Sequence, residues 1–99
     1  MSNQKQLRVV FMGTPDFSVP TLEALIKAGH SIVGVYCQPD KQKGRGKQVQ
    51  MPPVKVAALN HNLPVFQPVT LRDEQVQAEL EALNPDVVVV IAYGKILPP

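Results

Sequence analysis

The 99-residue sequence has little of several residue types: one cysteine, no tryptophan and only five aromatic side chains of the Phe and Tyr type. Cys37 cannot form a disulfide within the chain, and its place at the end of an apolar run predicts a buried thiol in a reducing compartment. The longest apolar run, 87–93, has seven residues, against roughly 20 needed to cross a bilayer. The apolar stretch 7–12 is too short for a secretory signal. We therefore expect one small cytoplasmic domain with no membrane contact.

Short apolar runs alternate with stretches of helical spacing. The first helix is expected to be capped by Ser18, with Gly29 just past its end, and the third to start with a capping box of Thr70 and Asp73. Pro52-Pro53 starts the second helix, 53–60. The predicted strands are 7–12, 32–37, 65–67 and 86–92. This βαβαβαβ order predicts an α/β fold with a doubly wound parallel sheet in the strand order 3-2-1-4, counted along the chain.

The last predicted strand, 86–92, is a nearly unbroken run of β-branched residues. Such a run is typical of a parallel strand that is covered by helices on both faces. The sequence after it contains no further helix or strand to pair with its outer edge. We therefore expect an incomplete sheet, marginal stability and a tendency to associate through this strand.

A basic segment, Pro39–Lys55, follows the second strand. It holds five of the ten Lys and Arg residues and one acid, so it carries a charge of +4 while all other residues sum to −2. Clustered positive charge favours contact with phosphates, because counterions are released on binding, and Gly44 and Gly46 allow the backbone to approach a nucleic-acid strand closely. A solvated connection between a strand and a helix explains the same composition, so both interpretations stay open at this point.

The turn Gly13–Phe17 leaves the first strand at the carboxyl edge of the sheet, where open α/β folds bind their ligands. It does not match the G-x-G-x-x-G fingerprint, because Pro15 and Ser18 stand where glycines are needed for close approach by a pyrophosphate. NAD binding is therefore disfavoured.

Five blocks, in order and covering almost the whole chain, resemble the bacterial methionyl-tRNA formyltransferases. They are VVFMGTPDFSVPTLEAL (9–25), QPDKQKGRGK (38–47), PPVKVAA (52–58), LPVFQP (63–68) and NPDVVVVIAYGKILP (84–98). The resemblance implies the N-terminal part of a Rossmann-like formyltransferase domain. It also implies transfer of a formyl group from 10-formyltetrahydrofolate to the amino group of methionine on the initiator tRNA, in protein biosynthesis, without a metal.

The resemblance places the basic segment at the acceptor arm of the tRNA. Arg45 is then expected to be the main contact, with Lys43 and Lys47 as phosphate partners and Lys41 as a further contact, while the role of Lys55 stays open. The planar guanidinium of Arg45 suits bidentate contact with a phosphate or a base edge. A segment of this kind suits the splayed single-stranded end of an RNA, which is where sequence-specific RNA recognition concentrates.

Two pockets follow from the same resemblance. Gly13, Thr14, Pro15 and Phe17 are expected near the methionyl side chain, although Phe17 could equally be packed in the core. The folate pocket is expected to be lined, largely through backbone groups, by the segment after the last strand: Tyr93, Gly94, Ile96 and Leu97.

The family's catalytic Asn, His and Asp have no counterpart in this sequence. His30 and His61 are interpreted as polar residues at helix ends, and Asp16, Asp40 and Asp86 as turn residues. We therefore expect residues 1–99 to be the N-terminal portion of the catalytic domain, without its C-terminal part or the C-terminal tRNA-binding domain, and to be inactive alone. The full-length protein is expected to be a monomer.

Two alternatives remain. The chain could be a non-catalytic RNA-binding module that holds phosphates through its basic segment. It could also belong to a folate-dependent formyltransferase that acts on a small amine, such as the glycinamide ribonucleotide or amino-arabinose enzymes. The former enzymes carry Gly-Ser-Asn where this chain has Thr14-Pro15-Asp16, and the latter lack an obvious GRGK insert. Both differences favour tRNA as the acceptor.

Overall fold

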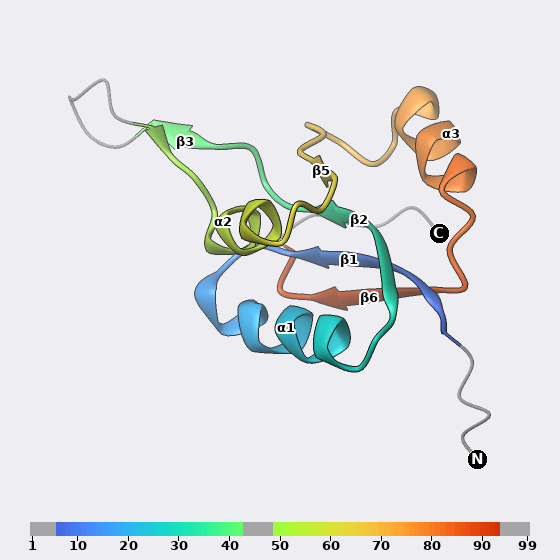
Figure 1. Cartoon of the computed structure of the whole chain (residues 1–99). Helices are drawn as coiled ribbons and strands as arrows, with labels where there is room; N and C mark the ends of the chain where they lie inside the picture. The colour runs from blue at the N-terminus through green and yellow to red at the C-terminus, as the bar shows by residue number, and fades with distance from the viewer. Residues whose placement is uncertain (1–5, 43–48, 94–99) are drawn as a thin grey trace, which may run out of the picture.

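The computed structural model describes residues 6–42 and 49–93 as a four-stranded parallel sheet with helices on its two faces (Figure 1). The elements are β1 (Arg8–Gly13), η1 (Asp16–Ser18), α1 (Val19–Lys27), β2 (Ser31–Tyr36), β3 (Lys41–Gln42), β4 (Val49–Gln50), α2 (Pro53–Asn60), β5 (Val65–Phe66), α3 (Glu74–Ala82) and β6 (Val87–Ile91). The sheet has the order β5-β2-β1-β6, and all its strand pairs are parallel. The predicted order 3-2-1-4 is therefore confirmed.

The side chains of β1 alternate between the two faces of the sheet, as the period of two along a strand requires. Val9 and Phe11 belong to a core cluster with residues of α1 and α2, whereas Val10 and Met12 belong to a second cluster on the other face. All four side chains are buried. β1 is thus the strand around which both layers of the fold are built.

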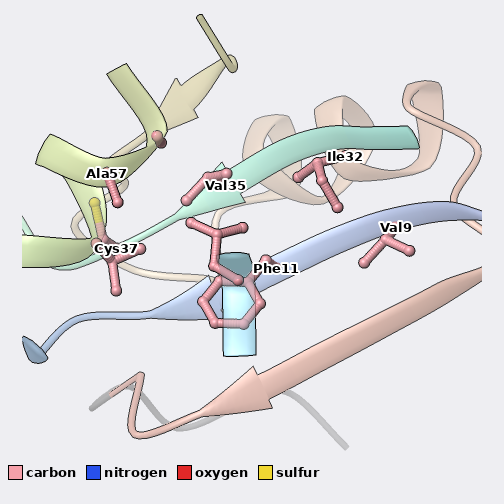
Figure 2. Packing of buried hydrophobic residues seen from close by; sticks show 9 residues of the cluster. Val9, Phe11, Ile32, Val35, Cys37 and Ala57 are labelled. Carbon is pink, nitrogen blue, oxygen red and sulfur yellow. The ribbon is translucent and has the colours of Figure 1, made fainter. Parts of the chain in front are cut away.

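The first cluster fills the space between the sheet and the pair of helices α1 and α2. Figure 2 shows Val9 and Phe11 of β1 beside Ile32 and Val35 of β2, with Ala57 of α2 near the end of β2. Cys37, Leu22, Val54 and Ala58 complete the buried set. The prediction of a buried thiol at Cys37 is confirmed.

The second cluster is smaller and lies under α3. Tyr36 stacks on Phe66 with ring centroids 4.9 Å apart and an interplanar angle of 21°. The side chains that α3 and its C-terminal end contribute, Val76, Leu80 and Leu83, are only partly buried. This face of the sheet is therefore covered less completely than the face under α1 and α2.

The pairing of β1 with β2 contains an irregularity at Gly34. Val9 pairs with Ile32 but Val10 pairs with Gly34, so β2 carries one extra residue at this point. A Cβ atom at Gly34 would lie 2.9 Å from a methyl carbon of Leu83 and 3.1 Å from the ring of Phe66. The glycine therefore allows the segment after α3 and β5 to approach the sheet.

Two of the predicted helix boundaries are confirmed. Pro53 begins α2, and Pro20 is accepted in the first turn of α1, where its missing N–H costs no hydrogen bond. Gly29, just past the end of α1, has φ of +89°, a left-handed conformation that glycine adopts without strain.

Two predicted caps differ in detail. Ser18 is the N-cap residue of α1, as expected, but its side chain makes no capping hydrogen bond; its hydroxyl instead donates a hydrogen bond of 2.8 Å to the carbonyl oxygen of Ile91 in β6. The N-cap of α3 is Asp73, whose carboxylate accepts from the backbone N–H of Gln75, while Thr70 accepts from the N–H of Arg72 in the preceding turn. In both cases the side-chain oxygen has a different backbone partner from the one that sequence spacing indicates.

The expectation that both faces of the last strand are covered is also wrong. Val87, Val88 and Val90 of β6 are 39%, 40% and 42% exposed. β6 is an edge strand whose one neighbour in the described sheet is β1. Its composition is that of a buried strand, but the described elements leave more than a third of the surface of each of these residues exposed.

The basic segment is not a plain loop. Lys41–Gln42 and Val49–Gln50 pair as the two antiparallel strands β3 and β4. In Figure 1 this hairpin projects beyond the sheet, at the end of the molecule away from α3. Within the described residues, no helix has the length and apolar character needed to span a membrane.

Candidate functional site at the carboxyl edge of the sheet

The carboxyl ends of the four parallel strands meet at one edge of the sheet, and polar residues follow them there. Thr14 comes after β1, Gln38 after β2, Gln67 after β5 and Tyr93 after β6. In open α/β sheets this edge is the usual place for ligands. It is therefore the candidate site.

Three of these segments are tied together at Tyr93. The hydroxyl of Thr14 donates to the carbonyl oxygen of Tyr93 at 2.9 Å, and the side-chain amide of Gln38 donates to the same oxygen at 3.0 Å. The backbone N–H of Gln38 in turn donates to the Thr14 hydroxyl at 3.3 Å. These bonds fix the ends of β1, β2 and β6 relative to one another.

A second group of bonds continues from Gln38 to the root of the β3–β4 hairpin. The side-chain amide of Gln67 donates to the carbonyl oxygen of Gln38 at 3.0 Å and to a carboxylate oxygen of Asp40 at 2.6 Å. The ammonium of Lys55 contacts both oxygens of Asp40, at 2.9 and 3.1 Å. The hydrogen bond from Lys55, and then that from Gln67, lowers the pKa of the Asp40 carboxyl below its ordinary value.

A small cavity opens beside this network. It measures about 190 Å³ and is lined by Thr14, Gln50 and the run Met51, Pro52 and Pro53 between β4 and α2. The backbone N–H of Val54 donates to the carbonyl oxygen of Thr14 at 3.3 Å, which joins the start of α2 to the turn after β1. The cavity walls are mainly apolar side chains with the Thr14 hydroxyl and an amide nearby.

Two buried tyrosines and Cys37 lie behind this edge. Burial raises the pKa of Tyr93 to about 12, with Cys37 and Tyr36 adding to the effect, and burial also raises the pKa of Cys37 to about 11. The pKa of Tyr36 is raised too, mainly by burial and less by Glu79. The hydroxyls of Tyr36 and Tyr93 have no hydrogen-bond partner among the described residues. All three groups are therefore neutral near pH 7 and do not serve as bases.

The structure brings some of the predicted site residues together. Gly13 ends β1, Thr14 bonds to Tyr93, and Pro15 accepts a hydrogen bond from the N–H of Ser18. The Tyr93 side chain, however, is buried in the second core cluster instead of lining an open surface. Phe17 is 66% exposed, which rules out the alternative that it packs in the core; it does not line the cavity beside Thr14, and its contact with the methionyl side chain stays a prediction.

The structure tests few of the remaining residues that were predicted to contact tRNA or folate. Lys41 is the first residue of β3. The others lie outside the described residues: Lys43, Arg45, Lys47, Gly94, Ile96 and Leu97.

Sequence reasoning misses the polar network itself. It interprets Asp40 as a turn residue and gives Gln38 and Gln67 no role. The available signal is positional, because Gln38, Gln67 and Asp40 each stand within four residues of the end of a predicted parallel strand. What the sequence cannot show is that Lys55, 15 residues after Asp40, returns to pair with it.

The two histidines lie away from this edge, as predicted for polar residues at helix ends. His61 follows α2 and contacts Glu23 of α1 at 2.9 Å, at the rim of a cavity of about 520 Å³ along α1. His30 follows α1 and accepts from the N–H of Leu7. In the part of the chain that the structure describes, no group of three His, Cys, Asp or Glu side chains is arranged to hold a metal ion.

Comparison with known proteins supplies the family. The family model described as "Formyl transferase" matches residues 7–99. The chain is 59% identical over 92 residues to the methionyl-tRNA formyltransferase of Alkaliphilus oremlandii (strain OhILAs), and 56% identical over 92 residues to that of Hydrogenovibrio crunogenus (strain DSM 25203 / XCL-2). Each alignment covers 93% of this chain and 30% of the relative, so the chain spans about a third of the length of these curated relatives. The chain belongs to the formyl transferase family.

Proposed function

We propose that this chain is the N-terminal portion of the catalytic domain of a cytoplasmic methionyl-tRNA formyltransferase. The enzyme would transfer a formyl group from 10-formyltetrahydrofolate to the amino group of methionine on the initiator tRNA. The observation that carries this proposal is the identity of 59% and 56% to two relatives of that name over nearly the whole chain. The described geometry supports it, because the polar network and a cavity lie at the edge of the sheet where this fold class binds ligands.

The cavity lined by Thr14 and residues 50–53 is our candidate for the methionyl side chain. A methionine side chain is flexible and apolar, and it fits an irregular apolar wall better than a rigid or charged group does. Met51 and the two prolines provide such a wall. Gly13, Thr14 and Pro15 would form its floor, and Phe17 would contact the substrate from the exposed side of the turn, where it has room to close over a ligand.

The folate pocket is assigned to the segment that begins at Tyr93. The carbonyl oxygen of Tyr93 already accepts two hydrogen bonds, from Thr14 and Gln38, so both its lone pairs are used. Tyr93 would therefore support the pocket wall without contacting the folate. Direct contacts would come from the following residues, Gly94, Ile96 and Leu97.

The tRNA contact is assigned to the hairpin. From Lys41 to Val54 the sequence contains four basic residues and no acidic one, so the positive charge of Lys41, Lys43, Arg45 and Lys47 is uncompensated along this stretch. Phosphates of the acceptor arm are the natural partner for such a stretch.

The catalytic step is assigned to the part of the family that this chain does not align with. Formyl transfer needs donors for the developing oxyanion and a group that relays the amine proton. The phenols and the thiol near this edge have raised pKa values and buried side chains, so they stay protonated and are not suited to take up the amine proton. We therefore propose that the chain alone is inactive, that the complete enzyme is monomeric and needs no metal, and that the catalytic residues come from the remaining length.

The proposal is tested by joining this chain to the remaining length of the Alkaliphilus oremlandii relative and measuring formylation of charged initiator tRNA. In that protein, Arg45→Ala should lower kcat/KM for tRNA by roughly 10- to 100-fold and leave folate affinity unchanged, because one arginine contact to a nucleic acid is lost. Arg72→Ala is the matched control, since Arg72 is an exposed arginine in the turn before α3.

Three results would contradict the assignment. Equal activity of the Arg45→Ala protein and its parent would remove Arg45 from the site. RNA binding without formylation would favour the non-catalytic RNA-binding module. Formylation of a small amine in preference to the charged tRNA would favour the small-molecule enzymes.

A further inference from the structure

The β3–β4 hairpin is closed at its root by a pair of charged side chains. Asp40 is the residue immediately before β3, and Lys55 lies in the first turn of α2, five residues after the end of β4. Both oxygens of Asp40 contact the Lys55 ammonium, at 2.9 and 3.1 Å. The pair thus joins the chain entering the hairpin to the chain leaving it.

This pair is continuous with the bonds at the sheet edge. Asp40 also accepts from Gln67, which donates to the carbonyl oxygen of Gln38, and Gln38 donates to the carbonyl oxygen of Tyr93. A path of hydrogen bonds therefore runs from the hairpin root, past the ends of β2 and β5, to the segment after β6. These are the places assigned above to tRNA and to folate.

Partial burial distinguishes this pair from an ordinary surface ion pair. The side chains of Lys55 and Asp40 are 17% and 27% exposed, against 36% and 47% for His61 and Glu23. A lysine that neutralises a phosphate must present its ammonium to the RNA. The Lys55 ammonium instead contacts the Asp40 carboxylate, which also accepts a hydrogen bond from Gln67. Exposed pairs contribute little to stability, but a shielded pair with a further hydrogen-bond partner holds a defined geometry.

We propose that Asp40 and Lys55 are positioning residues that hold the basic hairpin at a fixed angle to the sheet edge, and that Lys55 is not itself an RNA contact. The inference rests on the proposed tRNA function for its effect on binding, but the closure of the hairpin root is independent of that function.

The proposal makes an unusual prediction for Asp40→Asn. The substitution removes one negative charge beside a basic hairpin, so charge alone predicts tighter binding to RNA. If Asp40 positions the hairpin, binding is instead weaker, by roughly 3- to 10-fold. The sign of the change therefore separates the two explanations.

The test uses the full chain and an RNA minihelix with a single-stranded 3′ end, titrated over a range of salt concentrations. Asp40→Asn and Lys55→Met should weaken binding to a similar extent, and the double variant should bind no more weakly than either single variant, because both remove the same contact. The salt dependence should be unchanged, whereas loss of a phosphate contact would reduce its slope by about one. Lys55→Arg, which retains a cation that can reach Asp40, should restore binding.

Hydrogen exchange without RNA provides the second measurement. The amides of Gln38 and Val54 donate to the oxygen atoms of Thr14 at the hairpin root, so they report its opening. Their exchange should be at least about 5-fold faster in Asp40→Asn and Lys55→Met, with no change at the core strand β1. Glu23→Gln, which removes a carboxylate paired with His61 on the helical face, is the control that should leave both amides unchanged.

The outcomes are distinguishable. Tighter binding by Asp40→Asn, or a reduced salt slope in Lys55→Met alone, would make Lys55 a phosphate contact and overturn the proposal. If the parent chain binds no RNA, the proposed tRNA contact of this chain is wrong. The exchange data alone then decide whether Asp40 and Lys55 position the hairpin. Unchanged exchange at Gln38 and Val54 would then overturn it. If a substitution unfolds β1 as well, the same binding and exchange measurements are made on two milder variants. Lys55→Arg keeps the ion pair with Asp40, and Gln67→Leu removes only the hydrogen bonds from Gln67 to Asp40 and Gln38.

Discussion

β1 and β6 are parallel neighbours with similar apolar sequences, but their side chains differ in burial. Val10 of β1 pairs with Val88 of β6, and the two residues lie on the same face of the sheet. Val10 is fully buried, whereas Val88 is 40% exposed. The difference comes from what lies above each strand, since the α3 side chains pack with residues of β1, β2 and β5 and leave Val88 and Val90 uncovered.

The comparison shows that an apolar composition allows a strand to be buried, but that the elements packed against the strand determine whether it is buried. A row of β-branched residues has a large apolar surface, and covering it is favourable by roughly 25 cal/mol per Å². In this chain Val89 and Ile91 of β6 pack against the first core cluster, whereas Val87 at the start of that face and Val88 and Val90 on the α3 side stay exposed.

The largest expected difference between the two regions is in thiol reactivity. In the variant Val90→Cys, which keeps Cys37, a thiol-specific reagent at pH 8 should modify the introduced thiol on β6 before it modifies Cys37. The pKa of Cys37 is raised from 9.0 to about 11, so its thiolate fraction is roughly 100-fold lower than that of an ordinary thiol, and burial slows its reaction further. Site-resolved mass spectrometry gives the two rates. Similar rates would mean that the end of β2 opens as readily as the edge of the sheet.

The next largest effect is on stability, measured with paired substitutions. Val10→Ala should lower the free energy of unfolding by about 2–3 kcal/mol, because it removes two buried carbon groups and leaves a cavity. Val88→Ala, the matched control in the adjacent position, should cost less than about 1 kcal/mol. Urea unfolding at low protein concentration provides both values. Equal losses would show that β6 is covered in solution, for instance by a second copy of the chain.

The overall topology can be predicted from the sequence because it depends on local patterns. Apolar runs separated by helical spacing, together with Pro53 and Gly29 at helix ends, are enough to place the elements and to derive the strand order. The hairpin β3–β4 escapes prediction because its two strands have only two residues each, too few for a recognisable alternation. The side-chain caps predicted at Ser18 and Thr70 do not form, and each hydroxyl bonds to a different backbone group in the folded chain.

The sequence predicts where the candidate site lies in the fold, but not which side chains bond to each other there. The rule that ligands bind at the carboxyl edge locates Thr14 and Tyr93, and the structure joins them by a hydrogen bond. The pairing of Asp40 with Lys55 depends on how the hairpin returns to α2, and no local pattern records that distance. For the same reason sequence charge counts Lys55 with the basic hairpin, whereas its ammonium faces a carboxylate.

A smaller effect is expected on association. The exposed valines on an edge strand predict that the chain forms dimers or larger species through β6. Val90→Lys should weaken this association by about tenfold, because it places a charge in the contact. Ala78→Lys adds the same charge on the exposed side of α3 and should leave association unchanged. Sedimentation velocity measures both, and a parent chain that is monomeric with a cooperative unfolding transition would contradict the prediction.

The smallest effect is expected from pH, at the root of the β3–β4 hairpin. Asp40 has a folded pKa below its ordinary value of 3.8, so its contribution to stability is complete above pH 3.8 and is lost as the pH falls through the lowered folded pKa. The urea midpoint of the parent chain should therefore exceed that of Asp40→Asn at pH 7, and the two should converge at the acid end of this range. Lys55→Met removes the main cause of the lowered pKa, so that variant should lose most of this pH dependence as well. If the urea midpoints of the parent chain and Asp40→Asn still differ at pH values below the folded pKa of Asp40, then Asp40 stabilises the hairpin root through its shape and its bond to Gln67, independently of its charge.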